Sequence, residues 1–452
     1  MKITVCVKIV DGELNPFDEC ALEAALETEG AEITVISMGP ASAKAKLETL
    51  TRYNVKRVIL ISDPIFAGSD TLATAYILSK AIEKIDFDMI FCGRQTTDGD
   101  TAQVGPCLAA KLGIKPITNV MKAEFSADGA VCKTRLGEEN GAYPCLLTFE
   151  RINTLRFFSI RSRQKEIEVW DNSYIGADAA RCGLSGSPTK VLKVFESRRG
   201  IRKCRFISRE ELMPLIARLG EEESRETAIM PSEKKLRCVL ITDERVRKQA
   251  EAIAENVIEI SGHDPYKAAE QIKSSGADAA LWNADLEGRR NAPIAAGLLD
   301  LGLCADCTAL ETDGERLFMY RPARSGNITA KIKSDTFPQM ATVRTVERSD
   351  RIIVACGKGV KADMARVKEF AATLGAELCA SRGAVDAGQM PYSAQVGLTG
   401  RSVSPNVYIA VGISGAVHHT VGIENAKTVI AINPDRDARI FEYADYGIVE
   451  EF

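Results

Sequence analysis

Three polar loops near the start of the chain have the residue types that bind a nucleotide. They are NPFDE (15–19), AGSDTLAT (67–74) and CGRQTTDGDTAQVGP (92–106), and each follows an expected strand. Loops at the carboxyl ends of parallel strands are where α/β folds bind ligands. Asp100 or Thr101 could cap a helix whose first amides offer hydrogen bonds to a phosphate. The same residues are also common in turns that bind nothing, so the loops alone leave both interpretations open.

Three further loops near the end of the chain combine glycine with hydroxyl and cationic groups. They are SRGAVDAG (381–388), QVGLTG (395–400) and GISGAVHH (412–419). Ser414 and Gly415 lie where a strand is expected to give way to a helix, which suits pyrophosphate binding at a helix N-terminus. GISGA is not the G-x-S-x-G motif of hydrolases, and GKG at 357–359 lacks the spacing of a P-loop. The pattern therefore favours a nucleotide site over those two enzyme classes.

The elements that position these loops alternate between strand and helix. Apolar, β-branched runs predict strands at 3–9, 33–38, 57–62 and 88–92, with a helical pattern after each. Apolar strands separated by helices indicate a parallel sheet that is buried on both faces. Further alternations begin at RCVLIT (237–242) and RIIVACGKG (351–359). We therefore predict an α/β fold with Rossmann-like parallel sheets, in which two related N-terminal domains precede a C-terminal domain.

The first two alternations are interpreted as loose copies of each other. Each contains a helix, a turn, a strand with a basic residue and a final strand, YPCLLTF (143–149) in one and FPQMATV (337–343) in the other. Only the first copy carries the polar glycine-bearing loop. The expected domains are 1–195, 196–345 and 346–452.

Composition excludes several classes of protein. The chain has 58 Lys and Arg against 62 Asp and Glu, a net charge of −4, which argues against a nucleic-acid or polybasic membrane surface. No apolar run is long enough to span a bilayer, and the start of the chain lacks a signal-peptide core, so we expect a cytoplasmic protein. Thirteen cysteines and three histidines include only one C-x-x-C, Cys304 to Cys307, so we predict small core residues there and no metal site.

The long run from 381 to 449 resembles the FAD domain of the α subunit of electron transfer flavoproteins. RPARSGNITAKI (321–332) and FPQMATVR (337–344) look like the preceding domain of that subunit. NPFDECALEAAL, AGSDTLATA, GRQTTDGDTAQVGP and GLSGSPTKV resemble the β subunit. The resemblance thus implies a β–α fusion that acts as an intramolecular heterodimer.

The resemblance implies one FAD in the C-terminal domain. Arg382 is expected beside the flavin ring, where a fixed cation stabilises its negatively charged reduced form. Thr399 is expected to hydrogen-bond the flavin N5, and His419 to reach the pyrimidine carbonyl and add charge when protonated. Lys358 and Leu398 depart from the arginine and glutamine usual in the family. The full set is Lys358, Ser381, Arg382, Gln395, Val396, Gly397, Thr399, Gly412, Ser414, Gly415, Ala416, His419, Asn433 and Asp445.

The resemblance also implies a second nucleotide in the β-like domain, either FAD or AMP. The loop DGDTAQVGP (98–106) looks more like that of the bifurcating members, which hold a second FAD and oxidise NADH. AMP and FAD share an adenylate, so the loop by itself does not decide between them. The residues expected at this site are Val7, Asn15, Asp18, Ser37, Gly68, Asp70, Thr71, Gln95, Asp98, Gly99, Asp100, Thr101, Gln103, Val104 and Gly105.

The expected function is that of an electron carrier rather than a substrate-converting enzyme. The resemblance implies electrons from NADH or a flavin dehydrogenase of the acyl-CoA dehydrogenase type, with ferredoxin, flavodoxin or a quinone oxidoreductase as further partners. TLRFFSIRSRQKE (154–166) is similar to the loop with which the family grips its partners, and its alternative is an edge strand with a solvated basic face. The alternatives are simple transfer with FAD and structural AMP, an adenine-nucleotide-binding protein without redox role, and a degenerate fusion with a structural role.

Overall fold

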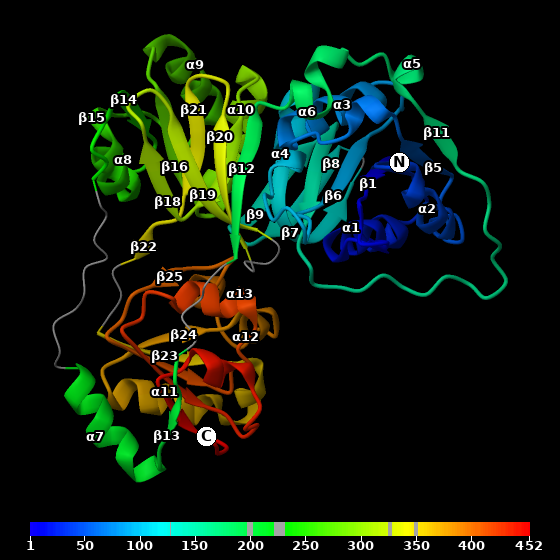
Figure 1. Cartoon of the computed structure of the whole chain (residues 1–452). Helices are drawn as coiled ribbons and strands as arrows, with labels where there is room; N and C mark the ends of the chain where they lie inside the picture. Colours follow the sequence, from blue (N-terminus) through cyan, green and yellow to red (C-terminus); the bar gives the residue numbers. More distant parts are fainter. Residues whose placement is uncertain (127, 197–201, 221–230, 324–327, 348–350) are drawn as a thin grey trace. The chain divides into compact units, whose positions relative to one another are not determined.

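The chain forms two compact units in a computed structural model that describes residues 1–126, 128–196, 202–220, 231–323, 328–347 and 351–452 (Figure 1). The first unit comprises 1–194, 231–324 and 330–343, and the second comprises 195–230, 325–329 and 344–452. Mainly parallel sheets with helices between their strands confirm the predicted α/β class. No helix within the described ranges is both long enough and apolar enough to span a bilayer.

The first unit begins with a nine-stranded sheet in the order β11-β5-β4-β1-β6-β10-β7-β8-β9. Its strands are parallel from β11 to β7, and β8 and β9 add an antiparallel extension. The four strands predicted in the first 92 residues are confirmed as β1, β4, β5 and β6. The bounds are β1 (Lys2–Cys6), β4 (Glu32–Met38), β5 (Arg57–Ile61), β6 (Met89–Gly93), β7 (Lys115–Phe125), β8 (Gly129–Thr134), β9 (Gly137–Ala142), β10 (Cys145–Phe149) and β11 (Glu168–Trp170). A short hairpin of β2 (Ile9–Val10) and β3 (Glu13–Leu14) precedes the first helix.

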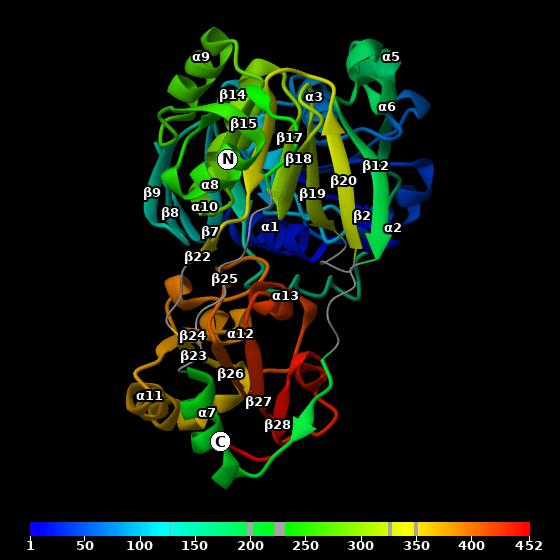
Figure 2. The ribbon, with the colours of Figure 1, turned by 60° about the vertical axis from the view of Figure 1, so that its left-hand side comes forward.

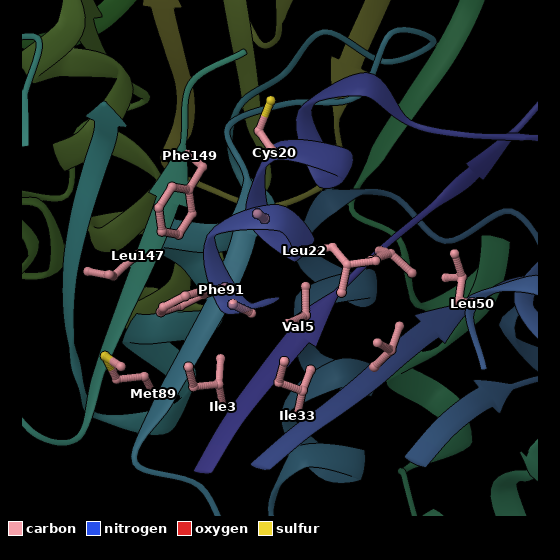
Figure 3. Close-up of a cluster of buried hydrophobic side chains, with 14 of the residues drawn as sticks. Ile3, Val5, Cys20, Leu22, Ile33, Leu50, Met89, Phe91, Leu147 and Phe149 are labelled. Atoms are coloured by element: carbon pink, nitrogen blue, oxygen red, sulfur yellow. The ribbon is translucent and has the colours of Figure 1, made fainter. Parts of the chain in front are cut away.

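Both faces of this sheet are buried, as its continuous apolar strands require. Met89 and Phe91 of β6 pack into the cluster of Figure 3, whereas Ile90 and Cys92 pack into a second cluster on the opposite face. This alternation follows from the period of two along a strand. The covering helices are α1 (Pro16–Glu27), α2 (Lys44–Leu50), α3 (Thr71–Ile82) and α4 (Val104–Leu112).

The second alternation repeats the topology of the first. Its five-stranded sheet has the order β15-β14-β16-β21-β17, which matches β4-β1-β6-β10-β7. The strands are β14 (Leu236–Ile241), β15 (Ala254–Glu259), β16 (Ala279–Asn283), β17 (Leu303–Cys307) and β21 (Gln339–Val343). The accompanying helices are α8 (Arg247–Ile253), α9 (Pro265–Ser275) and α10 (Leu286–Leu299). The common strand order supports the interpretation of two loose copies.

The two copies are joined within the first unit. Helix α4 packs against α10, and Lys111 donates to the carbonyl oxygen of Gly297 at 2.8 Å (Figure 1). Arg290 of α10 forms an ion pair with Glu139 of β9 at 3.0 Å. A four-stranded sheet in the order β12-β20-β19-β18 completes this unit, and Figure 2 shows these strands side by side. They are β12 (Thr189–Glu196), β18 (Ala309–Thr312), β19 (Leu317–Ala323) and β20 (Ile328–Ser334).

The second unit contains a parallel six-stranded sheet in the order β13-β28-β27-β26-β23-β24. Its strands are β13 (Arg205–Phe206), β23 (Ile352–Cys356), β24 (Glu377–Ala380), β26 (Val407–Val411), β27 (Thr428–Ile432) and β28 (Tyr446–Ile448). Helices α7 (Arg209–Gly220) and α11 (Met364–Thr373) bury apolar residues against it. A short pair, β22 (Val346–Glu347) with β25 (Ser402–Val403), lies outside this sheet.

Our expected domain ranges assign residues 205–220 to the middle domain. In the structure these residues belong to the second unit. Strand β13 pairs with β28, and Leu212 and Ile216 of α7 are buried in the same cluster as Val354. The apolar face of α7 therefore covers the C-terminal sheet, although α7 precedes the second alternation in the sequence.

Candidate functional site

A cavity of about 900 Å³ lies at the carboxyl ends of β1, β4, β5 and β6 and extends to the second copy. Both copies of the duplicated fold contribute to the wall of this cavity, since Leu303 and Arg321 from the second copy line it together with the loops of the first copy. Eleven of the expected residues line it: Val7, Asp18, Gly68, Asp70, Thr71, Gln95, Gly99, Thr101, Gln103, Val104 and Gly105. The three polar loops of the first copy thus converge on one space.

Buried polar contacts hold the loop that follows β6. The Arg94 guanidinium donates to the Glu150 carboxylate at 2.7 Å and to the side-chain oxygen of Gln95 at 2.6 Å. The amide group of Gln95 donates to Asp100 at 3.1 Å, and that of Asn15 donates to the Gln95 carbonyl at 2.9 Å. Asn15 and Asp100 therefore brace the loop and are not among the residues of the cavity wall.

Asp18 connects the ends of two strands. Its carboxylate accepts from the backbone N–H of Lys8 at 2.8 Å and of Gly93 at 3.1 Å. A Cβ at position 93 would lie 2.2 Å from the Asp18 carboxylate, so only glycine fits there. Burial raises the pKa of Asp18 to about 7, although the two amide donors favour its charged form.

Asp70 and Gln103 connect the cavity loops to other elements. Asp70 caps α3 through the Ala73 amide at 3.0 Å and accepts from the backbone N–H of Thr189 at 2.9 Å. The hydroxyl of Thr71 donates to Gln103 at 2.7 Å, and Gln103 donates to the Leu303 carbonyl in the second copy at 3.3 Å. These residues position the cavity wall as well as line it.

The last two expected residues of the first site have different surroundings. Asp98 accepts from the Lys8 ammonium at 2.6 Å, which holds its pKa below the usual range against the effect of burial. Ser37 in β4 is buried, and its hydroxyl has no hydrogen-bond partner among the described residues. Neither Asp98 nor Ser37 belongs to the cavity wall, to which the eleven residues named above contribute.

Arg321 is a charged residue of the cavity wall that was not among the residues expected at this site. It is only 6% exposed, and its Nε has no hydrogen-bond partner in the described parts of the chain. Leu317, Met319 and Arg321 alternate on the buried face of β19, so the period of two could have indicated an inward-facing cation. Lys8 also lines the cavity and was not assigned.

In the second unit, the expected loops gather at the carboxyl edge of the parallel sheet. Gly357 follows β23, Ser381 follows β24 and Gly412 follows β26. A Cβ at position 357 would lie 1.9 Å from the Gly412 carbonyl oxygen, so the two loops approach closely only because residue 357 is glycine. Asn433, which follows β27, donates to the carbonyl of Ile413 at 3.0 Å. Lys358, Ser414, Gly415 and Ala416 lie in these same loops.

Arg382 begins α12 (Arg382–Asp386), a short helix that the Ser381 hydroxyl caps through the Ala384 amide. Its guanidinium contacts the Asp386 carboxylate at 3.1 Å, one helical turn further on. Arg382 thus lies directly after β24, at the carboxyl ends of the strands, and its place beside a flavin ring stays a prediction.

The QVGLTG loop has an internal hydrogen bond of its own. Gln395 donates to the Thr399 hydroxyl at 2.8 Å, and Tyr392 donates to the Thr399 carbonyl. The amide of Val396 donates to the Ala380 carbonyl at 2.9 Å, so the loop runs beside the end of β24. The side-chain oxygen of Gln395 is buried without a hydrogen-bond partner among the described residues. This oxygen is therefore able to accept a hydrogen bond from a donor group of a ligand. Gly397 continues the loop between Val396 and Thr399.

His419 is expected to add charge at the flavin only when protonated, and its surroundings keep it neutral. Its Nε2 lies 2.9 Å from the Tyr408 hydroxyl, and its Nδ1 lies 3.1 Å from the Val396 carbonyl oxygen. The carbonyl requires a proton on Nδ1, which leaves Nε2 to accept from Tyr408. Burial lowers the pKa of His419 to about 4, so the imidazole is neutral near pH 7.

Asp445 lies at the amino-terminal ends of the parallel strands, whereas the expected site lies at their carboxyl ends. It directly precedes β28, and its carboxylate accepts from the backbone N–H of Val429, near the start of β27, at 2.8 Å. Its second partner is the Arg202 guanidinium. The residues before a parallel strand stand opposite those after it, so the structure separates Asp445 from the other expected residues.

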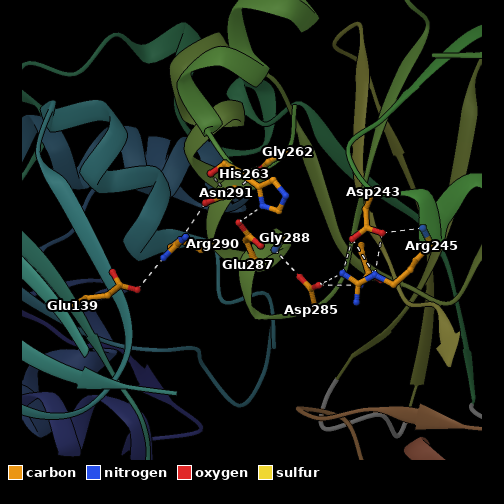
Figure 4. A network of polar contacts seen from close by, with 11 residues as sticks. Glu139, Asp243, Arg245, Gly262, His263, Asp285, Glu287, Gly288, Arg290 and Asn291 are labelled. Atoms are coloured by element: carbon orange, nitrogen blue, oxygen red, sulfur yellow. Dashed lines mark hydrogen bonds and ion pairs between the residues drawn. The ribbon is translucent and has the colours of Figure 1, made fainter. Parts of the chain in front are cut away.

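His263 is exposed and belongs to a surface network in the first unit (Figure 4). Its Nδ1 lies 2.9 Å from Glu287, and hydrogen bonding to that carboxylate raises the pKa of the imidazole. Among the described residues, no group of three or more His, Cys, Asp or Glu side chains is placed to hold a metal ion.

The residues at both sites fit nucleotide ligands. The cavity volume lies at the upper end of the range for small-molecule pockets, and Arg321 provides a buried cation for an anionic group. The C-terminal edge offers Arg382, the buried oxygen of Gln395 and closely approaching glycine loops. These donors, together with the Gln395 oxygen as an acceptor, suit a pyrophosphate and a ring with polar edges.

Comparison with known proteins supports the same interpretation. Residues 3–173 and 264–374 match the electron transfer flavoprotein domain, and residues 348–424 match the electron transfer flavoprotein FAD-binding domain. Protein FixA of Azorhizobium caulinodans is 38% identical over 229 residues, which cover 46% of this chain and 82% of the relative. The electron transfer flavoprotein β subunits of Clostridium acetobutylicum and Megasphaera elsdenii are each 41% identical, over 43% of this chain and 79% and 80% of their own lengths.

We predict that His419 makes stability depend on pH below neutrality. Its pKa is about 4 in the folded chain and about 6.5 in the unfolded chain, so the unfolded state binds more protons between these values. The free energy of unfolding should therefore fall by up to about 3 kcal/mol as pH is lowered from 6.5 to 4. Urea titrations at several pH values measure the free energy of unfolding of wild type and of His419→Gln. The difference between these two free energies should change with pH as expected for His419. His263→Gln is the control with the opposite sign, because Glu287 raises the pKa of that imidazole. An identical pH dependence in wild type and His419→Gln would contradict the prediction.

Proposed function

Because the chain belongs to the electron transfer flavoprotein family, we propose that it carries electrons between partner proteins through FAD held by its C-terminal unit. The observation that carries this proposal is the convergence of the loops after β23, β24 and β26 at one edge of a parallel sheet. The β-like and α-like parts lie in one chain, so the sites that two subunits would form are assembled within it.

Residues of this edge have distinct tasks toward FAD. When bound, FAD accepts and releases electrons, which is the chemistry that the protein side chains do not supply. Arg382 provides a fixed positive charge for the ring, and the Gln395–Thr399 hydrogen bond orients the Thr399 hydroxyl as a donor. His419 contributes a neutral imidazole rather than a cation, since burial lowers its pKa to about 4, and its contacts with Tyr408 and Val396 fix the ring.

We predict a yellow protein whose flavin potential depends on Arg382. Losing one charge-assisted contact of about 1.5–3 kcal/mol should lower the midpoint potential by about 60–130 mV for a one-electron step. Spectroelectrochemical titration of wild type, Arg382→Ala and Arg382→Lys measures this, with the lysine variant in between. Arg439→Ala is the control, because Arg439 is an exposed arginine that pairs with Glu442. A colourless protein that binds AMP but refuses added FAD would support an adenine-nucleotide-binding role without redox chemistry instead.

We propose further that the cavity of the first unit holds a second FAD, as in bifurcating members, with NADH as a donor. A volume of about 900 Å³ and a wall built from both copies support a dinucleotide over a single mononucleotide. Arg321 supports an anionic group at the side of the second copy. The alternative is AMP as a structural ligand, which needs only part of this space.

We predict that Arg321→Met weakens the nucleotide of the first unit and leaves the C-terminal FAD in place. A hydrogen-bonded charge contact contributes about 1.5–3 kcal/mol, so the affinity should fall about 10-fold to 150-fold. Chromatography of the nucleotides released by denaturation, after dialysis, counts FAD and AMP per chain. Two FAD per chain indicate a second flavin, and one of each indicates AMP. The control is Arg316→Met, since Arg316 is exposed and lies outside the cavity wall. Equal retention in the two variants would contradict the role of Arg321.

We propose that the segment 154–166 contacts partner proteins. Phe157 and Ile160 are 99% and 94% exposed, which is unusual for large apolar side chains in an otherwise polar segment. Phe158 anchors the segment, with the Arg52 guanidinium 3.6 Å from its ring centroid and the Tyr53 ring at 5.6 Å. The proposed partners are a flavin dehydrogenase of the acyl-CoA dehydrogenase type, ferredoxin, flavodoxin or a quinone oxidoreductase.

We predict that replacing both Phe157 and Ile160 with Ser slows electron transfer to a partner at least tenfold while FAD stays bound. Truncating two exposed apolar anchors should remove more than about 1.4 kcal/mol of binding free energy. Stopped-flow reduction with a purified acyl-CoA dehydrogenase measures the rate. Ile65→Ser serves as the control, because Ile65 is another exposed isoleucine that lies outside the segment. An unchanged rate in the double variant would assign this segment no role with that partner.

A further inference from the structure

Strand β17 contains an irregularity between Cys304 and Cys307. From Cys304 to Cys307, β17 advances by three residues. Over the same stretch its partner β21 advances by only two, from Ala341 to Val343. Asp306 at this bulge has a positive φ of 59°. In a regular strand, residues three apart point to opposite faces, and the extra residue of a bulge removes that opposition. Both cysteines accordingly belong to one buried cluster.

Backbone and side-chain contacts hold the bulge, and the Cys307 thiol adds a hydrogen bond to the Cys304 carbonyl oxygen at 3.6 Å. The Asp306 backbone N–H donates to the Thr342 hydroxyl at 2.7 Å, and its carboxylate accepts from Arg289 at 2.8 Å. The first copy has the same bulge at Asn119, whose φ is also 59° and whose N–H donates to Thr148 at 3.1 Å.

The residues at the two equivalent positions of the first copy are Ile117 and Val120. Both are fully buried in the core of the first sheet. The shared bulge therefore accepts apolar side chains at these positions, and its geometry does not require sulfur. At these two positions, cysteines occur only in the second copy, and Cys304 is the member of the pair that lines the cavity.

The surroundings of the two thiols differ. Cys304 lines the cavity together with Arg321, whereas Cys307 lies behind it and is completely buried. Hydrogen bonding from the Cys307 thiol lowers the pKa of Cys304 against the effect of burial, and Arg321 acts in the same direction. Burial is the main cause that raises the pKa of Cys307. Cys304 is thus the thiol that a molecule in the cavity reaches first, and the Cys307 sulfur lies beside it, 3.6 Å from the Cys304 carbonyl oxygen.

We propose that Cys304 and Cys307 form a dithiol site that undergoes thiol–disulfide exchange with small disulfides entering the cavity. The Cys304 thiolate attacks one sulfur of the small disulfide, whose S–S bond breaks and releases one thiol after protonation. Cys307 then loses its proton and attacks the Cys304 sulfur, which releases the second thiol. One small disulfide is reduced to two thiols, and one Cys304–Cys307 disulfide forms.

Because Cys304 belongs to the cavity wall, a nucleotide in the cavity blocks the approach of the small disulfide. This second part rests on the proposed nucleotide site, whereas the exchange itself rests on the bulge and the thiols. Occupancy of the cavity would then protect the dithiol from oxidation.

The test uses the full chain, reduced and then treated with oxidised glutathione. Peptide mapping by mass spectrometry should find the Cys304–Cys307 disulfide as the main product. Cys307→Ser should stop the reaction at a mixed disulfide of glutathione with Cys304, and Cys304→Ser should abolish both products. Cys238→Ser is the matched control, because Cys238 is only partly buried and lies outside the cavity wall. Cys304→Val keeps an apolar side chain like that of the first copy and covers the case in which the serine variant fails to fold.

Glutathione found on Cys238 and Cys204, with Cys304 and Cys307 left as thiols, would overturn the proposal, since simple exposure would then decide reactivity. In a second arm, AMP at about ten times its Kd should slow disulfide formation about tenfold. If AMP binds and the rate stays unchanged, access through the cavity is refuted. If neither AMP nor FAD binds to the first unit, the second-nucleotide proposal fails, while the disulfide measurement still decides the exchange.

Discussion

A parallel sheet that is buried on both faces leaves polar chemistry only at the ends of its strands. In both units, helices cover the faces, and the loops after the strands converge on one edge. The loop after β6 in the first unit and the loop after β26 in the second each lie at the carboxyl end of a parallel strand, although their residues differ. The candidate contacts of the loops depend on this constraint, whereas Arg321 comes from β19 of the separate four-stranded sheet.

Polar loops at a sheet edge bind a ligand well only when they are held in place before it arrives. In the first unit, the buried Arg94–Glu150 pair and the Gln95 contacts hold the loop after β6. Removing one partner of such a pair would leave an uncompensated buried charge, so the pair constrains the loop strongly. In the second unit, Gly357 and the Gln395–Thr399 hydrogen bond have the corresponding role.

The duplicated architecture explains how one cavity acquires residues from distant parts of the chain. The first copy supplies the polar loops, and the second supplies Leu303, Cys304 and Arg321. The two copies share a strand order and a bulge, yet Ile117 and Val120 of one stand where Cys304 and Cys307 stand in the other. The same backbone thus serves as core in one copy and as cavity wall in the other.

The sequence alone determined the α/β class and the four strands of the first 92 residues, because hydrophobic period and turn residues act over a few neighbouring positions. Only the tertiary structure placed Asp445 at the opposite sheet edge, joined the segment 205–220 to the C-terminal sheet and brought Arg321 to the cavity. It also decided that His419 is neutral, because its pKa depends on burial and on the partners Tyr408 and Val396. Burial and pairing of this kind arise between residues far apart in the chain, and local patterns do not encode them.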